Sequence, residues 1–428
     1  MSRIKVLTIC PYKLLPLKGG GALRCFHLLC QIARYNEVHA IIFQQEEELR
    51  TETEGYKVPD NVKIYSPIDN PPPPSFFDKL PQRIGPMLHY RWLRHSLRGP
   101  AESTLLRCHH LIEQILRNNE IDAIIFEHLS SMTAAPIISR LSPKTIRILD
   151  AHNVDHQLLA QEIESAPNRE EETSHRLKSF AKARWIEHNL NKYVHNFWAC
   201  SDNDRKVLDS INKIKGFTIP NGVDTEHFSF DKNVEKMQPP YLIFSGWMGT
   251  KANQDGLSFL MDDIWPRLLE TLPSLKLLIV GGGMPSQLIS KFKKSPNVDL
   301  VGSVPDVRPY FQKASISLVP LRIGSGTRLK ILESMSQGTP AVSTSKGAEG
   351  IKAKNGEHIL IADDPAGFVE AINSLLSDNH LFNKIRNSGR KLVEEKYDWN
   401  VIGKKIDQAI QEILSTQKLS HLRISDNH

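Results

Sequence analysis

The sequence predicts two tandem doubly wound, Rossmann-like α/β domains that face each other across a cleft. Three observations predict this class: the length, the composition and a repeated alternation of short apolar runs with helix-length segments. At 428 residues, the chain exceeds the size of one ordinary hydrophobic core. Its hydrophobic content of 40% and charged content of 24% are typical of a globular protein. The alternation predicts parallel sheets covered by helices on both faces.

The first domain is expected over residues 1–215. It opens with the apolar run R-I-K-V-L-T-I, a loop ending in three glycines, and a segment with helical apolar spacing, A-L-R-C-F-H-L-L-C-Q-I-A-R-Y. A polar stretch at 151–195 interrupts the pattern and predicts two helices. Further strands are expected at 38–43, 122–126, 145–150 and 195–200.

A linker over 216–239, containing I-P-N-G-V-D, leads to a second domain over 240–396. An amphipathic helix over 397–417 is expected to pack back on the first domain, and the polar tail 418–428 to be disordered. The strands expected in the second domain are 240–246, 275–283, 297–302, 316–320, 340–344 and 358–362.

Charge and cysteine usage narrow the class of protein. The net charge of +6 favours small anionic ligands or an anionic surface, and is too low for a nucleic-acid binder. The five cysteines form no C-x-x-C pair, which predicts reduced thiols in a cytoplasmic protein. No run reaches the roughly eighteen apolar residues of a membrane span. The first apolar run contains Lys5 and is a poor signal peptide, so we expect the protein inside the cell.

Residues 324–340, G-S-G-T-R-L-K-I-L-E-S-M-S-Q-G-T-P, follow an apolar run and predict a glycine loop that leads into a helix. Gly324 and Gly326 allow backbone amides to approach a ligand closely. The helix, expected to begin near Thr327, points its N-terminus at the same place. Amides and helix dipole together predict a phosphate site.

Charged side chains surround this loop. Arg328 and Lys330 add cations to it, with Arg322 just before it. They either compensate the charge of a phosphate or form a solvated basic helix face. Glu333, two turns into the helix, either accepts hydrogen bonds from the hydroxyls of a ribose or pairs along the helix with Lys330 or Gln337.

The run from Phe244 to Ile351 resembles the donor-binding domain of family 4 glycosyltransferases, retaining enzymes of the GT-B fold. The resemblance rests on F-S-G-W-M-G-T-K-A-N-Q-D, V-G-G-G, V-G-S-V-P-D-V and G-T-P-A-V-S-T in the family's order, with N-G-V-D in the linker. The helix is similar to that of a subgroup that reads G-x-G-T-R-L-K-I-L-E-x-M. The resemblance implies metal-independent transfer of a sugar from a nucleotide-diphosphate sugar to a hydroxyl acceptor, in cell-envelope or exopolysaccharide synthesis.

The resemblance also assigns residue roles. Glu333 matches the second Glu of the family's E-x7-E motif, which holds the donor ribose. The first Glu, which contacts the sugar, falls on Ser325, so amides near Gly326 and Thr327 are expected to replace part of that contact. The family's phosphate-binding Arg is replaced by Trp247, and Lys251 matches its Lys only loosely.

In the first domain, Gly20 and Gly21 resemble the family's glycine-rich loop beneath the diphosphate or the acceptor. The alternative is a flexible surface loop, since the pattern is not a dinucleotide fingerprint. Arg24, one turn into the following helix, is expected to reach an anion.

Histidines follow two neighbouring strands of the first domain. His128 lies after the strand at 122–126, and His152, with Asn153, follows the strand at 145–150. Family members often carry a histidine at the later position, near sugar and acceptor, so His152 is the better match; both can instead be structural. Glu127 is expected either to act as a base for the acceptor hydroxyl or to face the core.

For three other candidate residues we expect structural roles. Glu187 and His188 are expected on a helix, and Ser201 is predicted as the N-cap of a helix that includes Asp204. The chain lacks G-x-S-x-G and H-E-x-x-H, and we predict no bound metal and no cofactor besides the donor.

The segment 76–98 mixes aromatic and basic side chains, including Phe76, Phe77 and Trp92. It either contacts an anionic membrane, to reach a glycan or lipid-linked acceptor, or forms a helix pair packed on the first domain.

Two alternative functions of the whole chain stay open: a nucleotide-sugar epimerase, and an inactive sugar-nucleotide-binding subunit. Ser325 and Trp247 favour the second of these.

Overall fold

The computed structural model describes residues 3–17, 19–69, 109–164, 170–231, 233–324 and 326–425. The chain divides into two compact units. Met1–Ile219 together with Gly403–His428 form the first unit, and Pro220–Ile402 form the second. The segment 76–98 lies outside the described residues, so its two alternatives stay as predicted.

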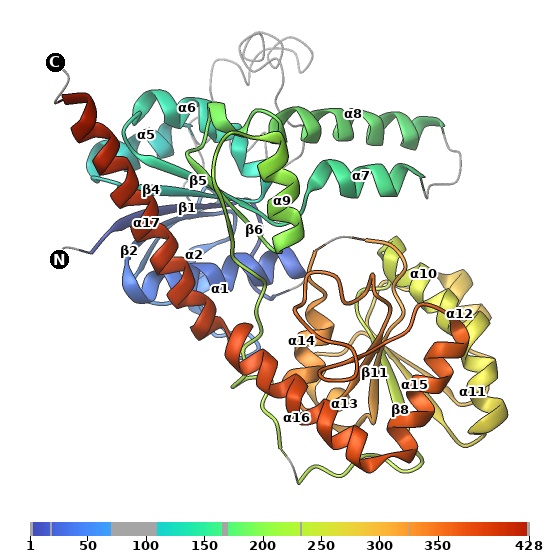
Figure 1. The fold of residues 1–428 in the computed structure, drawn as a ribbon. Coiled ribbons are helices and arrows are strands. Elements are labelled where there is room, and N and C mark those ends of the chain that lie inside the picture. Colours follow the sequence, from blue (N-terminus) through green and yellow to red (C-terminus); the bar gives the residue numbers. More distant parts are fainter. Residues whose placement is uncertain are drawn as a thin grey trace. The chain divides into compact units, whose positions relative to one another are not determined.

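The first unit is built on a seven-stranded sheet in the order β3-β2-β1-β4-β5-β6-β7 (Figure 1). All its neighbouring strands are parallel, and the central ones are continuous runs of buried residues, as expected for a sheet covered on both faces. The strand order reverses between β1 and β4, the point where open α/β sheets bind ligands. The strands are β1 (Lys5–Cys10), β2 (Glu37–Ile42), β3 (Val62–Tyr65), β4 (Ala123–Glu127), β5 (Ile146–Ala151), β6 (Asn196–Ala199) and β7 (Gly216–Thr218).

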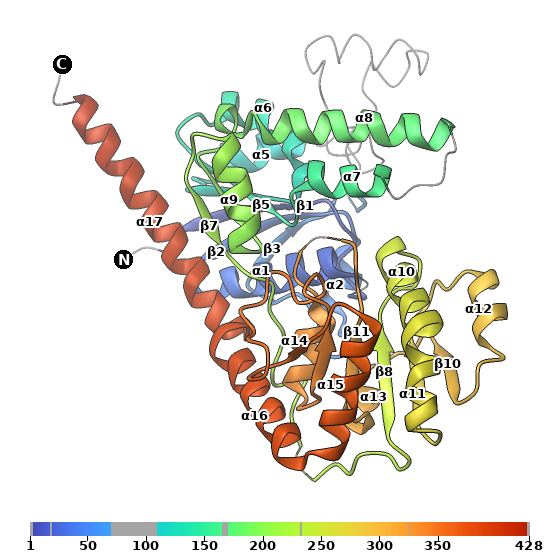
Figure 2. The same ribbon diagram turned by 45° about the vertical axis from the view of Figure 1, so that its right-hand side comes forward.

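Helices cover both faces of this sheet (Figure 2). They bury apolar side chains against the strands in a core that includes Ile9, Phe126 and Phe197. The helices are α1 (Gly20–Tyr35), α2 (Glu46–Arg50), α5 (His109–Asn118), α6 (Ala135–Leu141), α7 (Asp155–Glu164), α8 (Glu170–Glu187) and α9 (Asp202–Ile211), with short 3-10 turns η2 (Leu129–Ala134) and η3 (Leu190–Lys192).

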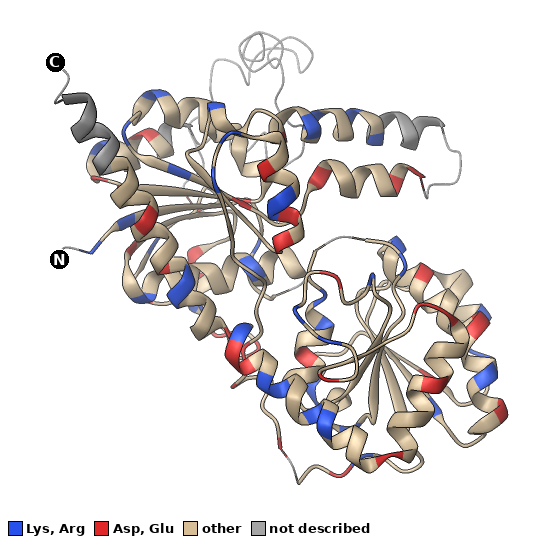
Figure 3. Cartoon of the chain, viewed as in Figure 1, with Lys and Arg blue, Asp and Glu red and all other residues tan. Residues whose placement is uncertain are grey.

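The second unit carries a six-stranded parallel sheet in the order β10-β9-β8-β11-β12-β13, which reverses between β8 and β11. Charged side chains lie on its helices and loops and are absent from strands β8, β11 and β12 (Figure 3). The strands are β8 (Tyr241–Ser245), β9 (Lys276–Val280), β10 (Val298–Gly302), β11 (Ile316–Val319), β12 (Ala341–Ser343) and β13 (Leu360–Ile361). The helices are α10 (Lys251–Phe259), the π-helical η4 (Leu260–Ile264), α11 (Trp265–Thr271), α12 (Ser286–Phe292), α13 (Arg308–Lys313), α14 (Leu329–Ser336), α15 (Pro365–Ser377) and α16 (Asn379–Lys396).

These two sheets confirm the predicted fold class of tandem Rossmann-like units. Two predicted details are corrected. The stretch predicted as a linker begins with β7, which pairs with β6 at the edge of the first sheet. The final helix, α17 (Trp399–Ser425), continues beyond residue 417 into the stretch predicted as disordered, and its residues from Gly403 onward belong to the first unit.

Candidate functional site

The predicted glycine loop lies at the carboxyl end of β11, and α14 begins two residues later than expected, at Leu329. Gly324 adopts a φ of +113°, and a β-carbon there would lie 2.7 Å from the Arg328 Nη2 atom. The positive φ favours glycine at this position, and the guanidinium lies close to its backbone. Thr327 is buried, and its hydroxyl has no hydrogen-bond partner among the described residues. Ser325 lies outside the described residues.

Lys330 lies beside the end of β8. Its ammonium donates a hydrogen bond to Asn253 Oδ1 at 2.9 Å and lies 4.9 Å from the centre of the Phe244 ring. A β-carbon on Gly246 would be 2.8 Å from Nζ, which places the ammonium against the backbone that follows the strand. Burial, together with the charge of Arg328, lowers the pKa of Lys330 to about 7. An anion bound here would restore the full positive charge.

Glu333 is partly exposed on α14, and its side chain forms no hydrogen bond or ion pair with the described residues. Burial raises the pKa of its carboxyl to about 7, against the opposing effect of Lys330. The predicted alternative, a helix pair with Lys330 or Gln337, is therefore not formed. A carboxylate held without a partner is suited to accept hydrogen bonds from a ligand.

Two of the other predicted cations stand apart from this group. Arg322 forms a two-bond ion pair with Asp255, at 2.6 and 3.0 Å, so its charge is already paired on the α10 side. Lys251 is the first residue of α10, a helix capped by Thr250, whose hydroxyl accepts a hydrogen bond from Asn253 N. The structure brings together Lys330, Arg328, Thr327 and Glu333 on one loop and helix at the switch point.

In the first unit, His152 lies just after β5 and is almost fully buried. Its Nε2 atom is 3.1 Å from an oxygen of Asp150. Burial opposes protonation of His152, but the Asp150 and Glu127 carboxyls raise its pKa. The two carboxyls therefore favour the protonated form of His152.

The prediction that Arg24 reaches an anion is wrong. Its guanidinium is 1% exposed and donates hydrogen bonds to both oxygens of Asp150, at 2.7 and 2.5 Å. Although burial opposes ionisation of Asp150, Arg24 and His152 hold its pKa well below the usual range. The guanidinium therefore fixes the carboxylate that orients His152 and cannot reach a soluble anion.

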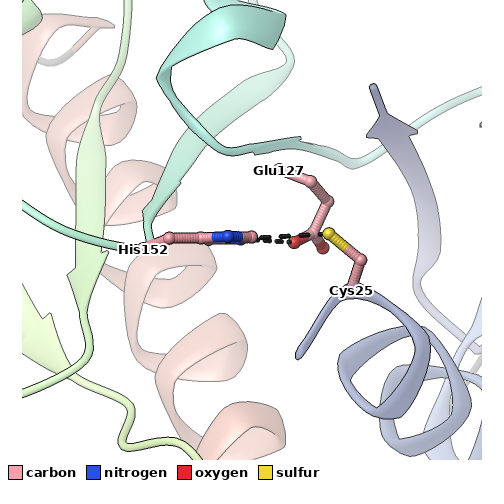
Figure 4. A group of neighbouring side chains, drawn as sticks. All are labelled: Cys25, Glu127 and His152. Atoms are coloured by element: carbon pink, nitrogen blue, oxygen red, sulfur yellow. Dashed lines mark hydrogen bonds and ion pairs between the residues drawn. The ribbon is translucent and has the colours of Figure 1, made fainter. Parts of the chain in front are cut away.

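Glu127, the last residue of β4, is fully buried and faces Cys25 of α1 and His152 (Figure 4). Neither of its carboxyl oxygens has a hydrogen-bond partner among the described residues. Burial raises its pKa to about 8, with a further contribution from Asp150. The full burial of Glu127 agrees with the core-facing alternative, and a role as a base for the acceptor hydroxyl stays a prediction.

One group of side chains has the composition of a metal site. The donor atoms of Cys25, Glu127 and His152 lie within 4.8 Å of one another, and sulfur, nitrogen and oxygen are ligands that zinc accepts. Burial raises the pKa of both Cys25 and Glu127, which favours the protonated forms that do not bind metal. The absence of a bound metal stays a prediction.

His128 caps the 3-10 turn after β4 by accepting a hydrogen bond from Ser130 N. Burial, and then the nearby His152, lower its pKa to about 3, so it is neutral. The rings of His128 and His152 lie 5.4 Å apart, and Tyr12 contacts both. The structure thus confirms that the two histidines lie together at the carboxyl edge of the sheet.

The remaining predicted residues of this unit fall around the same edge. Gly20 and Gly21 form the first turn of α1 and not the loop before it, and Asn153 is partly exposed after β5. Glu187 accepts hydrogen bonds from the first amides of α7, and Ser201 caps α9 as predicted.

Three residues of these groups were not predicted: Asp150, Cys25 and Asn253. Asp150 was detectable, because it ends an apolar run two residues before His152 and aspartate rarely ends a buried strand unpaired. Asn253 links Lys330 to the Trp247 carbonyl through its two amide atoms. Nothing in the sequence alone indicates that link.

Solved structures share the whole fold. Sucrose-phosphate synthase from Thermosynechococcus elongatus aligns with a TM-score of 0.68 and 14% identity, over 97% of this chain and 100% of that chain. HepE of Anabaena, solved in complex with UDP and glucose, aligns with a TM-score of 0.65 and 14% identity, over 96% and 100% of the two chains. The likeness shows that the chain has the GT-B fold.

Residues 239–378 match the family described as Glycosyl transferases group 1. This range lies within the second unit and contains the α14 site. Two proteins with similar sequences are the following. An uncharacterised 44.6 kDa protein in the cps region of Klebsiella pneumoniae is 25% identical, and the phosphatidyl-myo-inositol mannosyltransferase of Mycobacterium tuberculosis is 24% identical.

These alignments cover 48% and 46% of this chain and 58% and 53% of the relatives, so the chain spans little more than half the length of the curated relatives it matches. CapM of Staphylococcus aureus, a capsular polysaccharide biosynthesis glycosyltransferase, is 25% identical over 47% of this chain and 56% of its own. Within the described residues, no helix combines the length and apolar character needed to span a bilayer.

Proposed function

We propose that this chain is a retaining glycosyltransferase, which moves a sugar from a nucleotide-diphosphate sugar to a hydroxyl acceptor without a metal. The observation that carries the proposal is the α14 site inside the group 1 domain. There, two cations and an unpartnered carboxylate lie at the switch point of the sheet. The relatives' names support a role in capsular or other cell-envelope polysaccharide synthesis, with a glycan or lipid-linked acceptor.

In this proposal, the bond between the sugar's anomeric carbon and the diphosphate oxygen breaks as the acceptor oxygen bonds to that carbon. The acceptor's proton passes to the leaving phosphate. Arg328 and Lys330 stabilise the negative charge that grows on the diphosphate, so their effect is larger in the transition state than in the ground state. Lys330 gains its proton as the phosphate binds, because its pKa in the free protein is about 7.

The same site fits the nucleoside portion of the donor. Ionised Glu333 accepts hydrogen bonds from the two ribose hydroxyls, and the buried Thr327 hydroxyl is available to the diphosphate. HepE, solved with UDP and glucose, makes UDP-sugars the first donors to test. In the first unit, His152 is the residue proposed to take part in the transfer, positioned by Asp150 and Arg24.

Glu333→Ala is expected to weaken nucleoside binding about 10- to 100-fold, because it removes hydrogen bonds to a charged acceptor. Calorimetric titration with a nucleoside tests this, with exposed Glu370→Ala on α15 as the matched control.

Only the ionised carboxylate accepts both hydrogen bonds, so wild-type affinity should fall as the pH drops below about 7, the pKa of Glu333. The Glu333→Ala variant should lack this dependence; unchanged affinity in this variant would contradict the ribose role.

A further inference from the structure

Trp247 is the large apolar side chain most conspicuously exposed in the second unit, with 61% of its surface accessible. It lies two residues after β8 and immediately follows Gly246, the residue against which the Lys330 ammonium packs. A side chain of this size gains free energy when a partner covers it, and an indole face stacks well on flat rings. Its position beside the proposed diphosphate site suggests that the partner is part of the donor.

One part of the indole packs against the backbone of three glycines, Gly249, Gly282 and Gly283. A β-carbon on Gly283 would lie 2.7 Å from the indole Cε2 and Cζ2 atoms, and one on Gly282 would lie 3.0 Å from Cζ3. Gly249 is also too close to the ring to carry a side chain. Replacing any of these glycines would displace the ring, so the backbone supports one part of the indole while the remainder faces solvent.

Backbone hydrogen bonds fix the loops that contain these glycines. Met248 N donates to Gly282 O at 2.8 Å and Gly246 N donates to Val280 O at 2.9 Å, which ties the loop after β8 to the loop after β9. The Asn253 side chain donates to Trp247 O at 2.8 Å and accepts from Lys330. The same amide therefore fixes both the backbone of Trp247 and the proposed phosphate-binding ammonium.

The direction of the ring indicates which part of the donor it meets. Its six-membered edge extends over Gly282, a residue that also neighbours Ser303 in the loop after β10. This is the side of the switch point that leads from Lys330 toward the outer strands β9 and β10. A nucleotide with its diphosphate at Lys330 can place its base on that side.

We infer that Trp247 is a stacking platform for the nucleobase of the donor. The inference rests on the proposed function, since it requires a nucleotide at the α14 site. It also gives a role to a residue that, from the sequence alone, favoured an inactive subunit. Stacking on an aromatic ring tolerates different bases, so Trp247 contributes affinity, and backbone groups nearby are left to select the base.

Calorimetric titrations with UDP and with pyrophosphate test this inference on the full chain. Trp247→Ala is expected to weaken UDP binding about tenfold, while Trp247→Phe, which keeps a flat ring, should lose about threefold or less. Pyrophosphate has no base, so its affinity should be the same in wild type and both variants. UDP should also quench the tryptophan fluorescence of wild type more than that of Trp247→Phe. Because Trp247 is exposed, unchanged thermal melting of the variants serves as the folding control.

The outcomes separate this inference from the function on which it rests. Equal UDP affinity in wild type and Trp247→Ala overturns the stacking role alone, as does an equal loss of UDP and pyrophosphate binding. A Trp247→Ala variant that loses affinity for free sugars but not for UDP would show that the ring stacks on a carbohydrate, which also overturns it. Failure of wild type to bind UDP, GDP, ADP or any other nucleoside diphosphate would overturn the proposed function as well.

Discussion

Replacing Arg328 and Lys330 together by alanine is expected to lower turnover about 1000-fold, while nucleoside binding changes less than about threefold. Removing one group that stabilises developing negative charge typically costs about 100- to 1000-fold in rate. A nucleoside carries no phosphate, so it does not report on these cations. Steady-state kinetics with a nucleotide sugar and calorimetry with the nucleoside measure the two effects separately.

Lys384→Ala provides a control, because this lysine is exposed on α16 of the same unit and has the same charge. Its turnover should match wild type. If the double variant lost turnover and nucleoside binding to the same extent, the two cations would be holding the shape of the site and not acting on the leaving group.

Arg24→Ala is expected to lower the free energy of unfolding of the first unit by about 3–5 kcal/mol. The substitution leaves the buried Asp150 carboxylate without the two hydrogen bonds from the guanidinium, and removing one partner of a buried ion pair is strongly destabilising. Urea denaturation followed by circular dichroism measures the change. The double variant Arg24→Met with Asp150→Leu should lose less than Arg24→Ala, because it removes both charges of the buried pair together.

The comparison variant is Arg205→Ala, which removes a partly exposed ion pair with Asp209 on α9 of the same unit. Solvent screening limits such pairs to about 1 kcal/mol or less. Equal effects of Arg24→Ala and Arg205→Ala would show that the buried pair contributes no more than a surface pair, contrary to the interpretation of Arg24 as a positioning residue.

Local patterns predicted much of the fold. Apolar runs identified most strands of both sheets. The edge strands β3 and β7 were not predicted, because they are short and only partly buried and so have a weak apolar signal. The sequence pattern of β7 did not distinguish this strand from the linker that follows it.

The contacts of the charged residues could not be predicted in the same way. Arg24 and Asp150 are 126 residues apart in the chain, so only the folded sheet brings them together. The orientation of Glu127 was also undetermined, because every residue of β4 is buried and an alternating pattern is absent. Glycine spacing did predict the loop at Gly324, since the backbone there has a φ of +113° that residues with a side chain rarely adopt.

The central claim is that the α14 site holds a nucleotide-diphosphate sugar whose sugar is transferred. Incubating the purified chain with a panel of nucleotide sugars in the presence of EDTA, and measuring nucleoside diphosphate release together with the sugar product, tests it most directly. The account predicts release from at least one donor, with about one sugar hydrolysed or transferred per diphosphate, and loss of that release in the Arg328→Ala, Lys330→Ala variant. Tight nucleotide binding without release from any donor would contradict it and would instead support an inactive sugar-nucleotide-binding subunit.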